Sequence, residues 1–94
     1  MPARAKPLCA EVTVVNSRGL HARAAAKFVK LAESFDAAVI VAKDGMEVPG
    51  TSIMGLMMLG AGRHSMLELR VVGTQAPQAF AALVNLVESG FGED

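Results

Sequence analysis

The spacing of apolar residues changes along this chain, and that change restricts the possible folds more than any other feature. Apolar and polar residues alternate in Glu11–Val14 and in Leu67–Val71, which predicts half-buried strands over Cys9–Val15 and His64–Val72. Apolar residues three or four positions apart predict helices over about Ala22–Ser34 and about Gln75–Ser89. Because each element has one apolar side, we expect the helices to pack on a sheet. The apolar stripe expected for the second of these helices is Phe80, Leu83, Val84 and Val87.

The middle of the chain carries a strong hairpin signal. The β-branched stretch Ala37–Lys43 is followed by Asp44-Gly45, so Met46–Val48 is expected to return antiparallel to it. Pro49 lacks the N–H group that a sheet needs, which places this return strand at a sheet edge. With a short helix in Thr51–Gly60, the order becomes β-α-β-β-α-β-α. This order predicts an α+β fold, an open-faced β-sandwich with a four-stranded antiparallel sheet and helices on one face.

The composition limits both domain organisation and function. A length of 94 residues permits one small domain, which we assign to residues 9–94 after a flexible lead-in of residues 1–8. Nine basic and nine acidic side chains balance, and four Phe without Trp or Tyr leave few stacking platforms, which disfavours nucleic-acid binding. No apolar run approaches the ~20 residues of a membrane span. The single cysteine, Cys9, excludes an intrachain disulfide and a cysteine-cluster metal site, and it fits a reducing cytoplasm.

The functional prediction depends mainly on His21, in the segment Gly19–Arg23 between the first strand and the first helix. We expect it at or beside the helix N-cap, where unpaired N–H groups and the helix dipole favour an anion. Arg23 adds a fork of donors that suits phosphate oxygens. The pattern predicts an imidazole that carries a phosphoryl group; the simpler alternative is a solvated histidine beside a surface arginine. His64 is expected to be a solvated residue at the start of the last strand.

The short helix in Thr51–Gly60 is apolar nearly all the way round. Ser52 is a suitable N-cap for it. Because so short an element cannot bury every side, we expect part of Ile53, Met54 and Met57 to be exposed as a docking surface. The alternative is a wholly buried linker helix.

Two motifs resemble a known family, HPr, the histidine-containing phosphocarrier protein of the bacterial phosphotransferase system, together with its nitrogen-regulatory relatives. Gly19–Arg23 is similar to the active-site segment, with His21 at the phosphorylated position and Arg23 at its partner arginine. Ser52–Gly60 is similar to the regulatory segment, with Ser52 at the position that HPr kinase/phosphorylase modifies in some bacteria. The resemblance extends over nearly the whole chain from residue 11 to residue 88.

The resemblance implies a phosphoryl carrier rather than a self-sufficient turnover enzyme. Enzyme I, charged from phosphoenolpyruvate, would phosphorylate His21, by family analogy at Nδ1, and the chain would pass the group to a histidine of an enzyme IIA-type domain. The route would serve sugar uptake or nitrogen and carbon regulation. The resemblance implies a cytoplasmic monomer without cofactor, metal, nucleic-acid partner or membrane insertion. The phosphate-stabilising helix N-terminus would be Ala22, Arg23 and Ala24, and the partner-binding residues would be Lys27, Ile53, Met54 and Met57.

One position departs from the family pattern, because Ala24 stands where the family usually has proline. Alanine restores an N–H donor near the phosphate and removes a rigid ring, so it affects the balance between holding and releasing the phosphoryl group.

A second hypothesis is a regulatory or interaction module that is never phosphorylated and acts through Ile53, Met54 and Met57. A hydrolase has no support, because the sequence offers no second base, metal cluster or glycine cradle.

Overall fold

A computed structural model describes residues 6–93. Three helices and four strands follow one another in the predicted order, and a 3-10 helix, η1, follows the last of them. The elements are β1 (Leu8–Thr13), α1 (Ala22–Glu33), β2 (Ala38–Lys43), β3 (Met46–Pro49), α2 (Ile53–Met58), β4 (Met66–Val72), α3 (Ala76–Glu88) and η1 (Gly90–Gly92).

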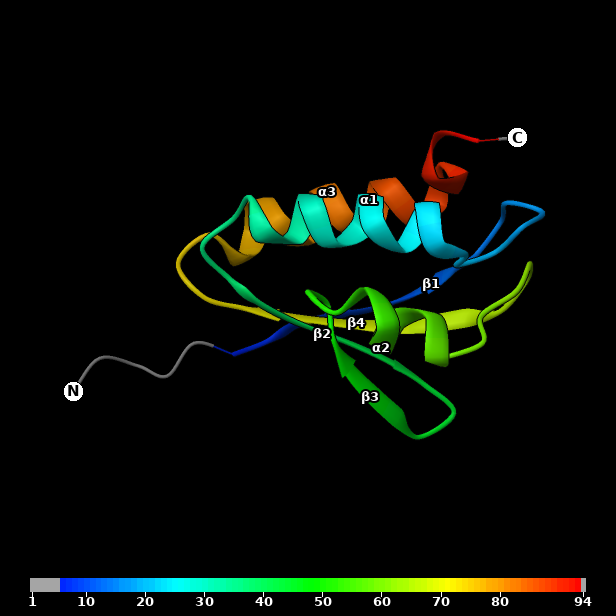
Figure 1. The fold of residues 1–94 in the computed structure, drawn as a ribbon. Helices are drawn as coiled ribbons and strands as arrows, with labels where there is room; N and C mark the ends of the chain where they lie inside the picture. The colour runs from blue at the N-terminus through cyan, green and yellow to red at the C-terminus, as the bar shows by residue number, and fades with distance from the viewer. Residues whose placement is uncertain (1–5, 94) are drawn as a thin grey trace.

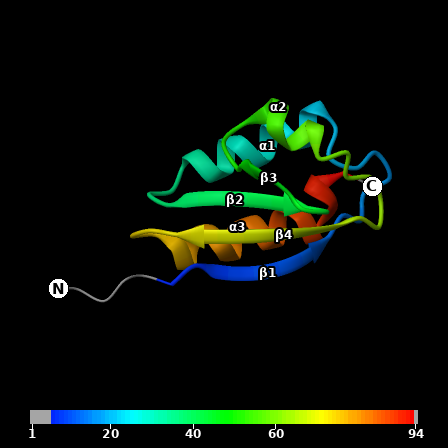
Figure 2. The same ribbon diagram turned by 90° about the horizontal axis from the view of Figure 1, so that it is seen from below.

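The four strands form one sheet in the order β1-β4-β2-β3, and every neighbouring pair is antiparallel. The strand that ends in Pro49 lies at the edge, as the missing N–H group predicted. Helices α1 and α3 lie side by side above the sheet, and α2 packs against α1 and β3 (Figure 1). From below, Figure 2 shows β1, β4 and β2 side by side, with α1 and α3 behind them. The predicted open-faced sandwich is therefore confirmed.

The core lies between the sheet and the two long helices. Its fully buried side chains come from alternate strand positions and from one stripe of each helix, as the sequence spacing predicts. On α3, however, the deeply buried residues are Ala76, Ala79, Leu83 and Val87, and the predicted core residues Phe80 and Val84 are only partly buried. The small alanines explain the difference, because they let the helix approach the sheet on their own side.

All four strands differ from their predicted bounds by one or two residues. β2 begins at Ala38 instead of Ala37, and β3 ends at Pro49 instead of Val48. β4 begins at Met66, so the predicted start at His64 is wrong, since His64 adopts a left-handed backbone with φ of 76° that ends strand geometry. β1 ends at Thr13, although Val14 still exchanges two backbone hydrogen bonds with the chain at His64 and Ser65. β1 also begins one residue early, at Leu8. The rest of the predicted lead-in lies mostly outside the described residues.

Candidate functional site

His21 is the N-cap of α1, which confirms its predicted position. Its backbone is extended, with φ of −75° and ψ of 179°, and its carbonyl accepts a hydrogen bond of 2.8 Å from the N–H of Ala25. The imidazole caps the helix unusually, because Nδ1 accepts a hydrogen bond of 3.2 Å from the backbone N–H of Arg23. The lone pair of Nδ1 therefore faces the positive end of the helix dipole.

The loop before His21 is fixed against the segment that follows α2. The N–H of Leu20 donates to the carbonyl of Ala61 at 2.9 Å. Gly19 has φ of 65°, and a Cβ atom there would lie 2.4 Å from the Ala61 oxygen. Only glycine fits this close approach without displacing the backbone.

The second ring nitrogen of His21 contacts a carboxylate from far along the chain. Nε2 of His21 lies 2.8 Å from Oε2 of Glu93, and these side chains are 22% and 16% exposed. Nδ2 of Asn16, a fully buried residue, donates to Oε1 of Glu93 at 3.0 Å and to the carbonyl of Gly19 at 2.8 Å. These hydrogen bonds, first that of Asn16 and then that of His21, lower the pKa of Glu93 below its ordinary value.

Glu93 reaches the site because the chain turns back after α3. Phe91, in η1, is buried with a left-handed φ of 59°, and its carbonyl accepts a hydrogen bond of 2.8 Å from Nζ of Lys27. Figure 1 shows this segment turning from α3 toward the start of α1. Sequence reasoning missed both Asn16 and Glu93. An apolar residue between two glycines after a helix was the only available signal for this segment.

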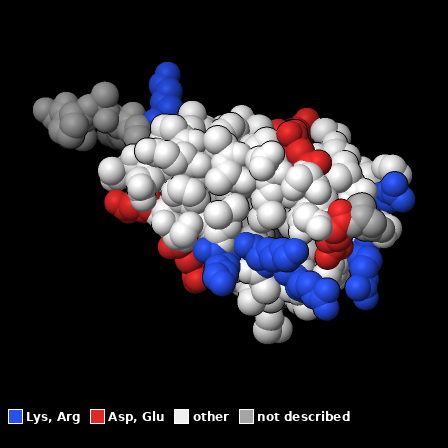
Figure 3. Space-filling view, turned by 90° about the horizontal axis from the view of Figure 1, so that it is seen from above, with Lys and Arg blue, Asp and Glu red and all other residues white. Residues whose placement is uncertain are grey.

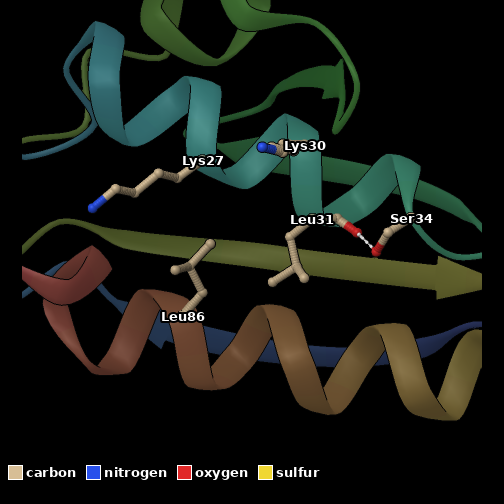
Figure 4. Close-up of a pocket in the computed structure, with 5 residues that line it drawn as sticks. All are labelled: Lys27, Lys30, Leu31, Ser34 and Leu86. Atoms are coloured by element: carbon tan, nitrogen blue, oxygen red, sulfur yellow. Dashed lines mark hydrogen bonds between the residues drawn. The ribbon is translucent and has the colours of Figure 1, made fainter.

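Lys27 also borders an apolar groove between α1 and α3 (Figure 4). Leu31 and Leu86 point toward each other across it, and Lys30 and Ser34 complete its lining. The groove has no histidine that could carry a phosphoramidate, and the hydroxyl of Ser34 in its lining donates to the carbonyl of Leu31 at 2.6 Å. We therefore take the region around His21 as the candidate site.

The helix end beside His21 offers further groups for an anion. The N–H groups of Ala22, Arg23 and Ala24 occupy the first turn, where no intrahelical acceptor exists. The side chain of Arg23 is exposed, and no group within residues 6–93 forms a hydrogen bond or ion pair with its guanidinium. Lys and Arg side chains gather along one border of the helix layer in Figure 3. Ala24 is fully buried, so the position where proline is usual packs against the core.

The comparisons with known proteins agree with this geometry. The family model described as the PTS HPr component phosphorylation site matches residues 8–89. This chain belongs to the HPr family. It is 43% identical over 82 residues to phosphocarrier protein HPr of Neisseria meningitidis serogroup A, covering 87% of this chain and 92% of that protein. It is 38% identical over 84 residues to phosphocarrier protein NPr of Escherichia coli K12, covering 88% and 93%. The crystal structure of HPr-C-His from Thermoanaerobacter tengcongensis is 40% identical, with a TM-score of 0.88 over 93% of this chain and 98% of that one.

The second motif of this HPr-family chain also has the predicted local structure. Ser52 is the N-cap of α2, and its Oγ accepts a hydrogen bond of 2.9 Å from the N–H of Gly55. Ile53, Met54 and Met57 are 40%, 74% and 44% exposed, so the predicted exposed apolar surface exists. Met58 extends it, because this residue is 67% exposed. The alternative of a wholly buried linker helix is wrong.

Within residues 6–93, no three His, Cys, Asp or Glu side chains are grouped so that they could hold a metal ion. Across the same residues, no helix has the length and apolar character to cross a membrane.

Proposed function

We propose that this HPr-family chain accepts a phosphoryl group on Nδ1 of His21 from enzyme I charged by phosphoenolpyruvate. It then passes the group to a histidine of an enzyme IIA-type domain in the cytoplasm, in sugar uptake or in nitrogen and carbon regulation. The observation that carries the proposal is the hydrogen bond that Nδ1 accepts from the N–H of Arg23. It supports a ring with its lone pair on Nδ1, directed at a helix end that attracts anions.

The transfer chemistry follows from this arrangement. The N–H of Arg23 gives up its hydrogen bond to Nδ1, whose lone pair forms a bond to phosphorus while the bond between phosphorus and the donor atom of enzyme I breaks, and the proton on Nε2 of His21 stays in place. The oxygens of the transferred group then meet the N–H groups of the first turn. The exposed guanidinium of Arg23 is within the same turn and can neutralise their charge.

A carrier must also release its phosphoryl group, so the stabilisation has to remain moderate. Solvent reaches the site, since the side chain of His21 is 22% exposed. Ala24 contributes an N–H donor that proline would lack. Because Ala24 is fully buried, this donor acts on the phosphate through the electrostatic field of the helix end, and exposure of the site to water and to an acceptor domain favours release.

We propose that both partners dock on the exposed surface formed by Ile53, Met54 and Met57, with Lys27 as a charged contact. The apolar side chains stand out from α2, which packs against α1, so a partner on this surface also reaches the helix that His21 caps. Lys27 is exposed but already donates to the carbonyl of Phe91, so a partner contact there has to share or replace that hydrogen bond.

We further propose that Ser52 is a regulatory phosphorylation site for an HPr kinase/phosphorylase. A phosphate on its oxygen would lie at the N-terminus of α2, where the dipole is favourable, and beside the apolar surface, where a hydrated anion opposes burial against a partner. Gly55 leaves room for the hydroxyl, since a Cβ there would approach Oγ of Ser52 to 3.0 Å.

Incubation with enzyme I and phosphoenolpyruvate, followed by intact mass measurement, tests the main proposal. We expect one added phosphate that is lost in acid, because a phosphoramidate hydrolyses at low pH and a phosphoserine does not. His21→Ala should remove this phosphate and leave the fold intact, because His21 is only partly buried. His64→Ala is the matched control and should be phosphorylated like the parent. Absence of an acid-labile phosphate on the parent would favour the interaction-module hypothesis.

A further inference from the structure

The contact between His21 and Glu93 takes no direct part in the bond changes at phosphorus. From it we infer that Glu93 is a positioning residue for His21, which keeps the imidazole proton on Nε2 and thereby leaves Nδ1 unprotonated, so that its lone pair can attack phosphorus once the N–H of Arg23 gives up its hydrogen bond. This inference deepens the proposed function and rests on it. Glu93 contacts His21 of the same chain, so the positioning needs no second molecule.

The hydrogen bonds at the two ring nitrogens select the same tautomer. A neutral imidazole has one N–H donor and one acceptor nitrogen. Nδ1 faces the N–H of Arg23 at 3.2 Å and must therefore act as the acceptor. Nε2 faces the carboxylate of Glu93 at 2.8 Å and must act as the donor. Each contact supports the other, so the ring is held in the tautomer that attack from Nδ1 requires.

Glu93 is itself held in place from two sides. Asn16, which is fully buried, donates to its Oε1 at 3.0 Å. The Oδ1 atom of Asn16 has no hydrogen-bond partner among the described residues, so this side chain is oriented for the two bonds that its Nδ2 donates. On the other side, Phe91 is buried and its carbonyl is bonded to Lys27, which anchors the segment two residues before Glu93. The carboxylate is thus part of an ordered structure.

The charge of Glu93 matters most while the phosphoryl group is attached. When Nδ1 shares its lone pair with phosphorus, positive charge spreads over the ring, and a carboxylate on Nε2–H stabilises it. The hydrogen bonds that lower the pKa of Glu93 keep it ionised for this task. The other charged group that acts on it is Lys27, whose ammonium favours the ionised carboxylate.

The test compares Glu93→Gln with the matched control Glu88→Gln. Glutamine keeps the size of the side chain and can still bond to Asn16, but it loses the charge and can donate as well as accept. Glu88 undergoes the same chemical change on an exposed position of α3. Ring ¹⁵N NMR of the unphosphorylated protein reports the tautomer directly. We expect the parent and Glu88→Gln to show a protonated Nε2 with slow proton exchange, and Glu93→Gln to show mixed tautomers with faster exchange.

The second measurement is the steady-state rate of phosphorylation by enzyme I. Losing a charge-assisted hydrogen bond should lower kcat about tenfold in Glu93→Gln and leave the KM for enzyme I unchanged, because docking involves α2. A purely structural role predicts that glutamine restores the parent rate. Parent-like NMR spectra and rates for Glu93→Gln, or a proton on Nδ1 in the parent, would overturn the inference. A parent that accepts no phosphate defeats the proposed function instead, and the NMR comparison still decides whether Glu93 controls the tautomer.

Discussion

Replacing Gly19 with alanine tests whether the loop before His21 depends on its close approach to the segment after α2. An added Cβ would lie 2.4 Å from the carbonyl oxygen of Ala61 and 2.8 Å from Cα of Gly62. Both neighbours are backbone atoms, which cannot turn away as a flexible side chain does. Relief of the clash must therefore lengthen the 2.9 Å hydrogen bond from Leu20 to Ala61 and shift His21.

Gly60 supplies a matched control, because its φ is also 65° and a Cβ there would meet nothing within 4 Å. The left-handed backbone costs alanine about 1–2 kcal/mol. The reduced entropy of the unfolded chain offsets about 0.4–1 kcal/mol of this. Gly60→Ala should therefore lower the free energy of unfolding by about 1 kcal/mol. Gly19→Ala adds displacement strain of about 1–3 kcal/mol and a weakened hydrogen bond of about 0.5–1.5 kcal/mol, for a total of about 3–5 kcal/mol.

Urea unfolding of both variants at neutral pH measures this difference, and phosphorylation of the folded protein by enzyme I measures its effect on the site. We expect Gly19→Ala to be the less stable of the two and the slower to accept phosphate, and Gly60→Ala to be phosphorylated at the parent rate. Equal losses of stability in the two variants would show that the contact with Ala61 does not restrain the loop, and the reasoning would be refuted.

Three further predictions concern single side chains. Arg23→Ala should slow phosphoryl transfer by about one to two decades, equivalent to about 1.5–3 kcal/mol. Arg23→Lys should recover part of the lost rate, because lysine keeps the charge but not the fork of donors. A parent-like transfer rate for Arg23→Ala would contradict a role of Arg23 in transfer. Ser52→Asp should weaken the binding to enzyme I that calorimetry measures, without lowering the melting temperature, because aspartate also caps helices. Ser52→Ala should lose ~1 kcal/mol of stability and bind enzyme I as the parent does. An unchanged affinity of Ser52→Asp for enzyme I would argue against regulation. The lowered pKa of Glu93 stabilises the segment around Phe91 at pH values above the ordinary pKa of 4.5. This contribution is lost as the pH falls through the lower pKa of the folded state. The NMR signals of the Phe91 ring should therefore stay constant down to about pH 4.5 and change only below it.

Local patterns in the sequence were sufficient to predict the sheet, the helices and the position of His21. Alternation over β1 and β4, the turn at Asp44-Gly45 and the proline of β3 each act over a few residues, so they can be recognised without the fold. The start of β4 was misplaced because the alternation of Leu67, Leu69 and Val71 does not mark where the strand begins, and the backbone of His64 is left-handed. Alternation reports burial and carries no information on φ.

The carboxylate of Glu93 could not be predicted in the same way. Its partners, Asn16 and His21, lie 77 and 72 residues away, and no local period connects positions so far apart. Asn16 is typical of an ordinary turn residue, but in the fold it is fully buried, lies beside Gly90 of η1 and donates to Glu93. The role of His21, unlike its position, remains a prediction that the transfer assays test.

The pairing of β1 with β4 has a consequence for how the protein folds during synthesis. β1 has no other strand to pair with, and β4 follows α2, so the sheet cannot close until most of the chain has been made. Long-range pairing of this kind slows folding. His21 precedes β4 in the chain, whereas Ala61, which accepts the hydrogen bond from Leu20, and Glu93, which contacts the imidazole, both follow α2. The loop before His21 and its imidazole therefore gain these contacts only after the later segments have been made.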